Sequence, residues 1–203
     1  SVPTTSTDEN ATVYVGSDGN NLSAVDAETG AEQWRFTTGG SIESSPTVVN
    51  DLVYVGSGDN NLYAIDAETG NKVWEFTTSG SIYRSSPTII GGTVYIGSED
   101  GNVYAIDAET GEKQWEFATA TGGIGSSPTV VDGTVYIGSD GGNLYAIDAE
   151  TGSEQWHFAT NSDVVSSPAV VDGSVYVGSY DMNLYAIDAE TGSEQWHFST
   201  GDY

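Results

Sequence analysis

The chain has 203 residues, no cysteine, and 30 acidic against 4 basic side chains, which gives a net charge of −26. Disulfides and cysteine-based metal or redox centres are therefore excluded. Nucleic acids and anionic membrane surfaces are unsuitable partners, because phosphate binding depends on Lys and Arg side chains that release counterions. We also expect no membrane insertion, since no stretch approaches the ~18 apolar residues of a spanning helix.

The acidic composition is consistent with adaptation to high salt. Many acidic chains are disordered, but 11% of the residues here are aromatic and the apolar residues recur periodically. At about 1 M salt the screening length falls to about 3 Å, so repulsion between like charges is largely removed. We expect a halophilic source, with an extracellular or cell-surface position in a halophilic archaeon favoured. The alternative is an acidic face that binds calcium or a basic partner.

A tryptophan recurs along the whole chain at intervals of 40, 41, 41 and 40 residues. The valine that opens each Val-Tyr-(Val/Ile)-Gly segment keeps the same four intervals. Self-similarity at a fixed period predicts an array of one repeated unit. The tryptophans are Trp34, Trp74, Trp115, Trp156 and Trp196, and the valines are Val13, Val53, Val94, Val135 and Val175.

Each unit contains four segments typical of β-strands, and the second unit shows them in order. Residues 44–49 open with Ser-Ser-Pro and end in β-branched residues, and residues 53–56 read Val-Tyr-Val-Gly. Residues 62–65 form the third segment and residues 73–77 the fourth. Between them, residues 66–70 read Asp-Ala-Glu-Thr-Gly, which predicts a tight turn closed by the Asp side chain and by Gly. The pattern predicts four antiparallel strands joined by hairpins.

The second and third segments are apolar on both faces, so both faces of each small sheet should be covered. Sheets covered on both sides by copies of themselves are typical of a propeller. We therefore predict an all-β fold, a β-propeller of five four-stranded antiparallel blades in one domain. From the valine to the tryptophan is always 21 residues, whereas the distance from the tryptophan to the next Ser-Ser-Pro proline varies, which locates the connectors. The predicted blades span approximately residues 1–40, 41–81, 82–122, 123–163 and 164–203.

The number of blades in the ring stays open at this point. If five blades close a ring, the chain should be a monomer. If they belong to a larger ring, two apolar blade faces are exposed and we expect self-association.

Every unit carries the motif A-x-D-x-x-T-G-x-x-x-W. It resembles the tryptophan-docking motif of the quinoprotein (pyrroloquinoline-quinone) propeller repeats, a WD-like repeat, over essentially the whole chain. The resemblance implies that each tryptophan packs onto the neighbouring blade and that the motif is structural. Its aspartates are Asp26, Asp66, Asp107, Asp148 and Asp188, and its glycines are Gly30, Gly70, Gly111, Gly152 and Gly192.

The function that we expect is a non-catalytic scaffold for a protein or saccharide partner. Quinoprotein dehydrogenases build their site from residues unique to particular blades, and these blades are nearly interchangeable. The alternatives are a quinone-dependent dehydrogenase or a fragment of one, and an engineered or excised repeat with no ligand of its own. We predict no catalytic residue, no cofactor and no bound metal.

Residues that could suggest chemistry have structural explanations in this pattern. The carboxylates of Asp-Ala-Glu-Thr-Gly recur five times, where an active site would occur once. His157 and His197 occupy a position that takes Arg or Glu in other units, as a solvated strand face does. Residues 17–20 and 139–142 resemble calcium loops but lack the alternating ligand set, so hairpins are expected.

A few residues depart from the repeat and are the candidates for recognition. Tyr83 and Arg84 lie in the second connector, and Tyr180 and Met182 interrupt a hairpin of the fifth unit. We predict a recognition patch from these four residues if they lie on one rim.

Replacing one motif tryptophan by alanine tests the docking role. Burying ~150–250 Å² of indole at ~25 cal/mol/Å² gives an upper bound of roughly 4–6 kcal/mol. We expect Trp115→Ala to lower the free energy of unfolding by about 3–5 kcal/mol in urea denaturation. A loss under about 1 kcal/mol would contradict the role.

Overall fold

The structure is a computed structural model that describes residues 11–120 and 122–201. Its strands form five antiparallel sheets in chain order. Four sheets have four strands each, and the first has three described strands. The start of the first predicted blade, residues 1–10, lies outside the described residues. The prediction of an all-β propeller with antiparallel blades is confirmed.

The strands follow the repeat from blade to blade. Blade 1 contains β1 (Thr12–Gly16), β2 (Asn21–Asp26) and β3 (Glu32–Thr37). Blade 2 contains β4 (Thr47–Val49), β5 (Leu52–Gly56), β6 (Asn61–Asp66) and β7 (Lys72–Thr77). Blade 3 contains β8 (Thr88–Ile90), β9 (Thr93–Gly97), β10 (Asn102–Asp107) and β11 (Lys113–Ala118). Blade 4 contains β12 (Thr129–Val131), β13 (Thr134–Gly138), β14 (Asn143–Asp148) and β15 (Glu154–Ala159), and blade 5 contains β16 (Ala169–Val171), β17 (Ser174–Ser179), β18 (Asn183–Asp188) and β19 (Glu194–Ser199).

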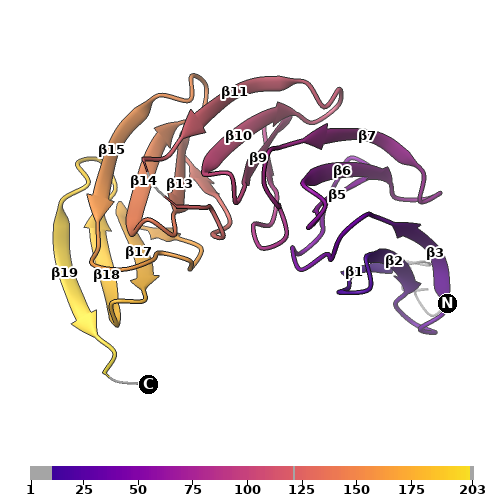
Figure 1. The fold of residues 1–203 in the computed structure, drawn as a ribbon, viewed down its shortest axis with the longest axis horizontal. Coiled ribbons are helices and arrows are strands. Elements are labelled where there is room, and N and C mark those ends of the chain that lie inside the picture. Colours follow the sequence, from indigo (N-terminus) through magenta and orange to yellow (C-terminus); the bar gives the residue numbers. More distant parts are fainter. Residues whose placement is uncertain (1–10, 121, 202–203) are drawn as a thin grey trace, which may run out of the picture.

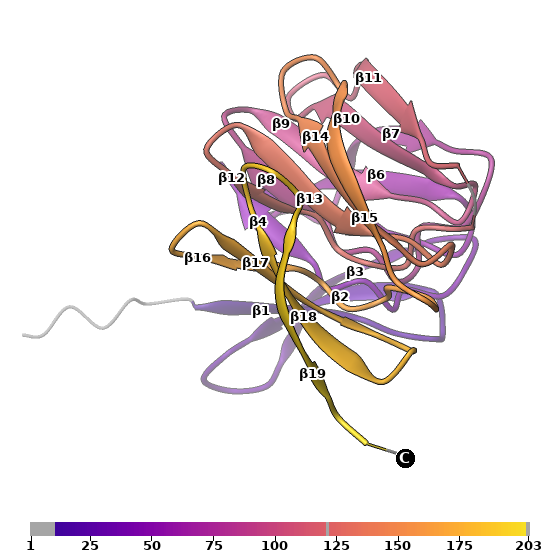
Figure 2. The same cartoon turned by 90° about the vertical axis from the view of Figure 1, so that its left-hand side faces the viewer.

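The blades follow one another around an open arc. In Figure 1 the indigo blade 1 and the yellow blade 5 lie at opposite ends of the arc, and Figure 2 shows the blades stacked face to face between them. Neighbouring blades approach most closely at their first strands, β4, β8, β12 and β16. Of the two possibilities left by the sequence, the described residues form an open set of blades and not a closed ring of five.

The apolar cores lie between blades, because alternate side chains of a strand point to opposite faces of the sheet. In blade 2, Val53 and Val55 point toward blade 1 and are fully buried there. Tyr54 lies between them and packs toward blade 3. We call the face toward the preceding blade the leading face and the face toward the following blade the trailing face. Four such cores join blade 1 to blade 2, blade 2 to blade 3, blade 3 to blade 4 and blade 4 to blade 5.

The Asp-Ala-Glu-Thr-Gly turns are closed by their own side chains, as predicted. In the second unit, Asp66 Oδ1 accepts hydrogen bonds from the Thr69 amide at 2.8 Å and from the Thr69 hydroxyl at 2.6 Å. These bonds hold the pKa of the Asp66 carboxyl below its ordinary value. Gly70 completes the turn at φ +72°, a conformation open to glycine at little cost.

The predicted strand at residues 44–49 begins only at Thr47, because its first residues serve a different purpose. The Ser44 hydroxyl donates to the Gly56 carbonyl at 3.1 Å and accepts from the Gly56 amide at 2.9 Å. The Ser44 hydroxyl thus supplies the hydrogen bonds that a neighbouring strand would otherwise give to the backbone of Gly56. Pro46 has no N–H group and cannot donate such a bond. Ser85 and Ser166 accept a hydrogen bond from Gly97 and Gly178 in the same way.

In blades 1 to 4, the glycine that ends the strand before the central hairpin lies beneath a connector: Gly16, Gly56, Gly97 and Gly138. A Cβ atom at Gly97 would overlap Ile124 Cγ2, and Ile124 is buried. We expect Gly97→Ala to lower the free energy of unfolding by about 1–3 kcal/mol, because the connector must shift. Gly19→Ala is the matched control, since a Cβ there meets its nearest atom at 3.6 Å. Urea denaturation of both variants tests this, and equal stability of the two would contradict the account.

Candidate functional site: the blade joints and one rim

The motif tryptophan of one blade lies against the turn of the next blade. At the joint between blades 1 and 2, Trp34 Nε1 donates a hydrogen bond to the Ala67 carbonyl at 2.9 Å. The Tyr14 hydroxyl donates to the same carbonyl at 3.2 Å. Two aromatic side chains of blade 1 therefore converge on one backbone oxygen of blade 2. Asp66 fixes the turn that presents this oxygen.

The same geometry recurs at the three following joints. The indole-to-carbonyl distances are 3.0 Å for Trp74 to Ala108, 3.0 Å for Trp115 to Ala149, and 3.1 Å for Trp156 to Ala189. Tyr54, Tyr95 and Tyr136 donate to the same three carbonyls.

The motif glycine has a second role besides closing the turn. A Cβ atom at Gly70 would lie 2.7 Å from Trp34 Cδ2, which is too close for two carbon atoms in a folded protein. Gly111, Gly152 and Gly192 stand in the same relation to the preceding tryptophan. The turn therefore needs glycine both for its backbone angle and for the indole that covers it.

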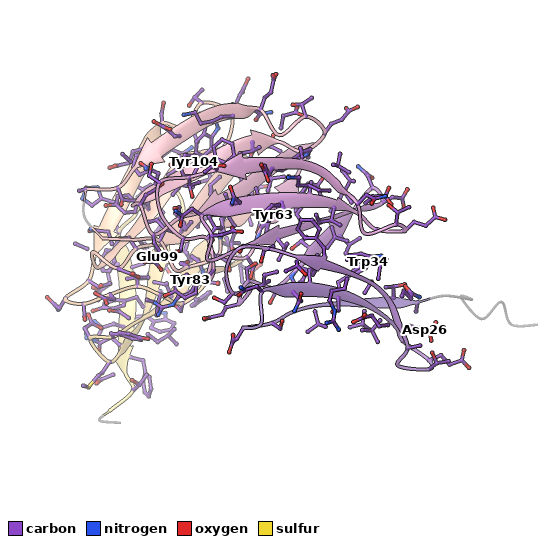
Figure 3. The ribbon with its side chains drawn as sticks, turned by 45° about the vertical axis from the view of Figure 1, so that its right-hand side comes forward. Asp26, Trp34, Tyr63, Tyr83, Glu99 and Tyr104 are labelled. Carbon is purple, nitrogen blue, oxygen red and sulfur yellow. The ribbon has the colours of Figure 1, made fainter. Side chains whose placement is uncertain are left out.

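Two residues of the motif, Gly30 in blade 1 and Trp196 in blade 5, take part in no such joint within the described residues. Trp196 is 45% exposed, and within the described ranges its indole N–H donates to no acceptor. At Gly30, no atom of the described residues lies within 4 Å of the position of a Cβ. Trp34 and Asp26 mark this end of the molecule in Figure 3.

Tyr83 and Arg84 lie in the connector between β7 and β8, next to the hairpin that joins β9 and β10. The Arg84 guanidinium lies 5.0 Å from the centre of the Tyr83 ring, as in a cation–π contact. Burial raises the pKa of the carboxyl groups of Glu99 and Asp140, and the positive charge of Arg84 offsets only part of this rise. The labelled Tyr83 and Glu99 can be followed in Figure 3.

Glu99 and Asp140 are recognition candidates that the sequence analysis missed. Each has one buried carboxylate oxygen, Glu99 Oε1 and Asp140 Oδ1, without a hydrogen-bond partner in the part of the chain that the structure describes. Burial is the main cause that raises the pKa of both groups, and nearby acids, Asp140 for Glu99 and Asp163 for Asp140, raise it further. Gly123 leaves room for Glu99, because a Cβ at Gly123 would lie 2.6 Å from Glu99 Oε2, and Gly125 lies beside Asp140. In the sequence, the glycine-rich third connector was the feature that could have pointed to these two residues.

Tyr180 lies on the same rim as Asp140 and Arg84. Its amide donates to the Asp163 carbonyl at 2.9 Å, as the Asp140 amide does to Gly123 in the preceding blade. The Tyr180 side chain is 55% exposed. Met182 follows two residues later in the same hairpin, at φ +68°. We refer to Arg84, Glu99, Asp140, Asp163 and Tyr180 together as the connector rim.

The histidines lie on the outer strands. His157 Nδ1 lies 2.8 Å from Glu154 Oε1, and His197 Nδ1 lies 2.8 Å from Glu194 Oε1, with all four side chains exposed. Residues 11–120 and 122–201 contain no group of three or more His, Cys, Asp or Glu side chains that could hold a metal ion. They also contain no helix with the length and hydrophobicity needed to cross a bilayer.

Shallow clefts recur between neighbouring blades beside the motif turns. One of about 450 Å³ is lined by Tyr54, Asp107 and Gln114, and another by their counterparts Tyr95, Asp148 and Gln155. Because the same residue types line each cleft, the clefts follow the repeat and do not single out one site.

Solved structures confirm the propeller architecture. BamB from Moraxella catarrhalis is 26% identical, with a TM-score of 0.83 over 94% of this chain and 62% of that one. The computationally designed Ika8 protein is 17% identical, with a TM-score of 0.83 over 94% of this chain and 59% of that one. Quinohemoprotein alcohol dehydrogenase from Comamonas testosteroni is 18% identical, with a TM-score of 0.79 over 94% of this chain and 42% of that one. The chain thus spans less than two thirds of the length of these proteins.

The family comparison covers almost the whole chain. No curated protein sequence matches it. The family model described as outer membrane protein assembly factor BamB matches residues 3–127 and 99–202. The chain therefore belongs to the PQQ-like β-propeller repeat family of the outer membrane protein assembly factor BamB.

Proposed function

We propose that the chain is a non-catalytic scaffold that binds a protein partner at the connector rim. The observation that carries this proposal is the pair of carboxylates there, Glu99 and Asp140, each with a buried oxygen that accepts no hydrogen bond in the described part of the chain. They lie where the otherwise interchangeable blades differ, beside Arg84 and the glycine-rich connector.

The carboxylates define the chemistry of the partner. A buried acceptor without a donor is costly, and the cost is removed when a ligand supplies an N–H group. The charge of Arg84 offsets only part of the rise in pKa that burial causes in both groups, and Arg84 donates no hydrogen bond to Glu99 Oε1 or Asp140 Oδ1. The proposed partner therefore presents Lys or Arg side chains, which suit paired carboxylates on an acidic surface.

The family supports a protein partner over a small molecule. The matching family model is described as an assembly factor for outer membrane proteins, which is a role in protein assembly. A saccharide partner and a quinone-dependent dehydrogenase stay predictions from the sequence. Adding pyrroloquinoline quinone with calcium and following dye reduction tests the latter.

In this proposal the motif tryptophans, aspartates and glycines are structural. They hold the blades in register through the joints, and the joints do not involve the connector positions at which Arg84 and Gly123 depart from the repeat. The connector rim then acquires its individual residues without a change to the packing between blades.

A labelled hexa-arginine peptide is a suitable probe of the rim. We expect the double variant Glu99→Gln/Asp140→Asn to bind it at least about tenfold more weakly than the unmodified chain, equivalent to about 1.4 kcal/mol. Fluorescence anisotropy at about 0.5 M salt keeps long-range attraction screened.

The matched control removes the same charge elsewhere. Glu109→Gln/Glu150→Gln neutralises two exposed carboxylates in motif turns, and we expect its affinity to change less than about twofold. An equal loss in both double variants would show that net charge alone binds the peptide, and would overturn the rim as a site.

The contribution of Glu99 to the free energy of unfolding should depend on pH. Burial and Asp140 raise the pKa of Glu99 above its ordinary value, so ionisation of this group opposes folding. We expect Glu99→Gln to be more stable than the unmodified chain near pH 7. The difference should disappear as the pH falls through the folded pKa to about 3.5, where the unmodified side chain is protonated in both states. Urea denaturation at the two pH values checks this, and a constant difference would contradict it.

A further inference from the structure

Arg84 differs from the other lysine and arginine side chains because it forms no ion pair. The other three each pair with a glutamate three residues away on the same outer strand: Arg35, Lys72 and Lys113. Arg84 pairs with no carboxylate in the part of the chain that the structure describes. An unpaired cation therefore lies at the rim, close to the carboxylates of Glu99 and Asp140.

The position of Arg84 results from an insertion in the second connector. In every connector a buried Ile or Val bonds through its amide to the preceding blade, and a serine further on bonds to the following blade. One residue separates these two anchors in the first, third and fourth connectors, whereas Tyr83 and Arg84 both lie between Ile82 and Ser85. The Ile82 amide donates to blade 2 at 3.0 Å, and the Ser85 hydroxyl oxygen accepts from blade 3 at 3.0 Å. Because both ends are held, the additional residue extends onto the rim, where Arg84 is exposed.

The Arg84 guanidinium lies over an aromatic ring and not on the carboxylates. It is 5.0 Å from the centre of the Tyr83 ring. Within the described residues, Glu99 Oε1 and Asp140 Oδ1 are buried and accept no hydrogen bond. The charge of Arg84 nevertheless acts on both groups, since it offsets part of the rise in pKa that burial causes. Arg84 is thus near two acceptors that it leaves unbonded.

No side chain separates Arg84 from one of these acceptors. Both lie against Gly125, where a Cβ atom would be 3.4 Å from Arg84 Cδ and 3.7 Å from Asp140 Oδ1. The corresponding residue of the fourth connector is Val165, which has a branched side chain. The glycine therefore leaves a path along which rotation of the Arg84 side chain carries its guanidinium from Tyr83 to the carboxylates, without movement of the backbone.

We propose that Arg84 is an internal competitor for the connector rim, held aside by the ring of Tyr83. When it leaves this ring, its guanidinium occupies the carboxylates of Glu99 and Asp140, which are the groups that a cationic partner binds. The inference rests on the proposed function of the rim and adds a regulation of the same site.

The competition is sensitive to Tyr83, because the two contacts of Arg84 are similar in strength. A cation–π contact at an exposed site and an exposed ion pair each stabilise a side chain only slightly. A small change in either contact therefore redistributes Arg84 between them. The affinity for a partner falls by the fraction of molecules in which the carboxylates are already occupied. Tyr83 thus raises the affinity of the rim without contacting the partner.

The labelled hexa-arginine peptide measures this competition by fluorescence anisotropy at about 0.5 M salt. We expect Tyr83→Ala to bind the peptide at least about threefold more weakly, because no ring then holds Arg84 away from the carboxylates. Tyr83→Phe retains a ring and should restore the affinity. Arg84→Gln should bind at least about threefold more tightly than the unmodified chain. Circular dichroism checks that each variant keeps its β-structure.

Two controls separate competition from other effects. Lys113→Gln removes one positive charge from an exposed ion pair, and we expect it to change the affinity less than about twofold. In Tyr83→Ala/Arg84→Gln the lost ring has no cation to hold, so the affinity should stay within about 1.5-fold of that of Arg84→Gln. An equal loss on Tyr83→Ala in both backgrounds would show that the ring contacts the peptide itself, and would overturn the proposal.

A measurement without peptide distinguishes a failure of this inference from a failure of the rim. In Tyr83→Ala the Arg84 Nε–H proton, followed by NMR at pH 7, should exchange with solvent more slowly than in the unmodified chain, because the carboxylates accept it. Adding Glu99→Gln/Asp140→Asn should remove this protection. Unchanged exchange in Tyr83→Ala would overturn the competitor and leave the rim standing. Slower exchange, together with peptide binding that Glu99→Gln/Asp140→Asn does not weaken, would instead overturn the rim as the site of the partner.

Discussion

The convergence of a tryptophan and a tyrosine on one backbone carbonyl of the next blade is the contact on which the arrangement of blades depends. The donor pair comes from the second and fourth strands of one blade, and the acceptor comes from a turn fixed by the motif aspartate. Because Trp34 and Tyr14 both reach Ala67, the two sheets are fixed in distance and in register by groups that are partly buried between them. Blade contacts that are otherwise apolar and non-directional gain a defined geometry from these bonds.

This contact explains which positions of the repeat are uniform and which are not. The motif glycine must both adopt a positive φ angle and leave space for the indole, so Gly70 and its counterparts have no substitute of larger size. The connectors keep one buried apolar residue each, such as Ile124, but vary at other positions, and this is where Arg84 and the glycines near Glu99 appear. The proposed rim and the structural joints are thus separated in the molecule, and the scaffold tolerates individual residues on the rim without a loss of packing.

The strands and the blade architecture could be predicted from the sequence, because the same pattern occurs in all five units. The strands, the turns and the blade architecture follow from the valine-to-tryptophan spacing and the Asp-Ala-Glu-Thr-Gly segments. The hydroxyl of Ser44 that completes the pairing of Gly56 could not be predicted, since Ser-Ser-Pro has strand-like neighbours and its proline suggested a strand start. Glu99 and Asp140 were missed because their unpaired oxygens result from three-dimensional crowding between two blades, and nothing in the hairpin residues alone marks it. The open arc also lay beyond the sequence, because the angle between blades is set by packing.

The exchange of the five indole N–H protons with solvent, followed by NMR at a concentration where the chain is monomeric, tests the joint most directly. The account predicts four protons that are protected by hydrogen bonds to Ala67, Ala108, Ala149 and Ala189, and one proton, that of Trp196, that exchanges rapidly. Five protons with the same exchange rate would contradict it.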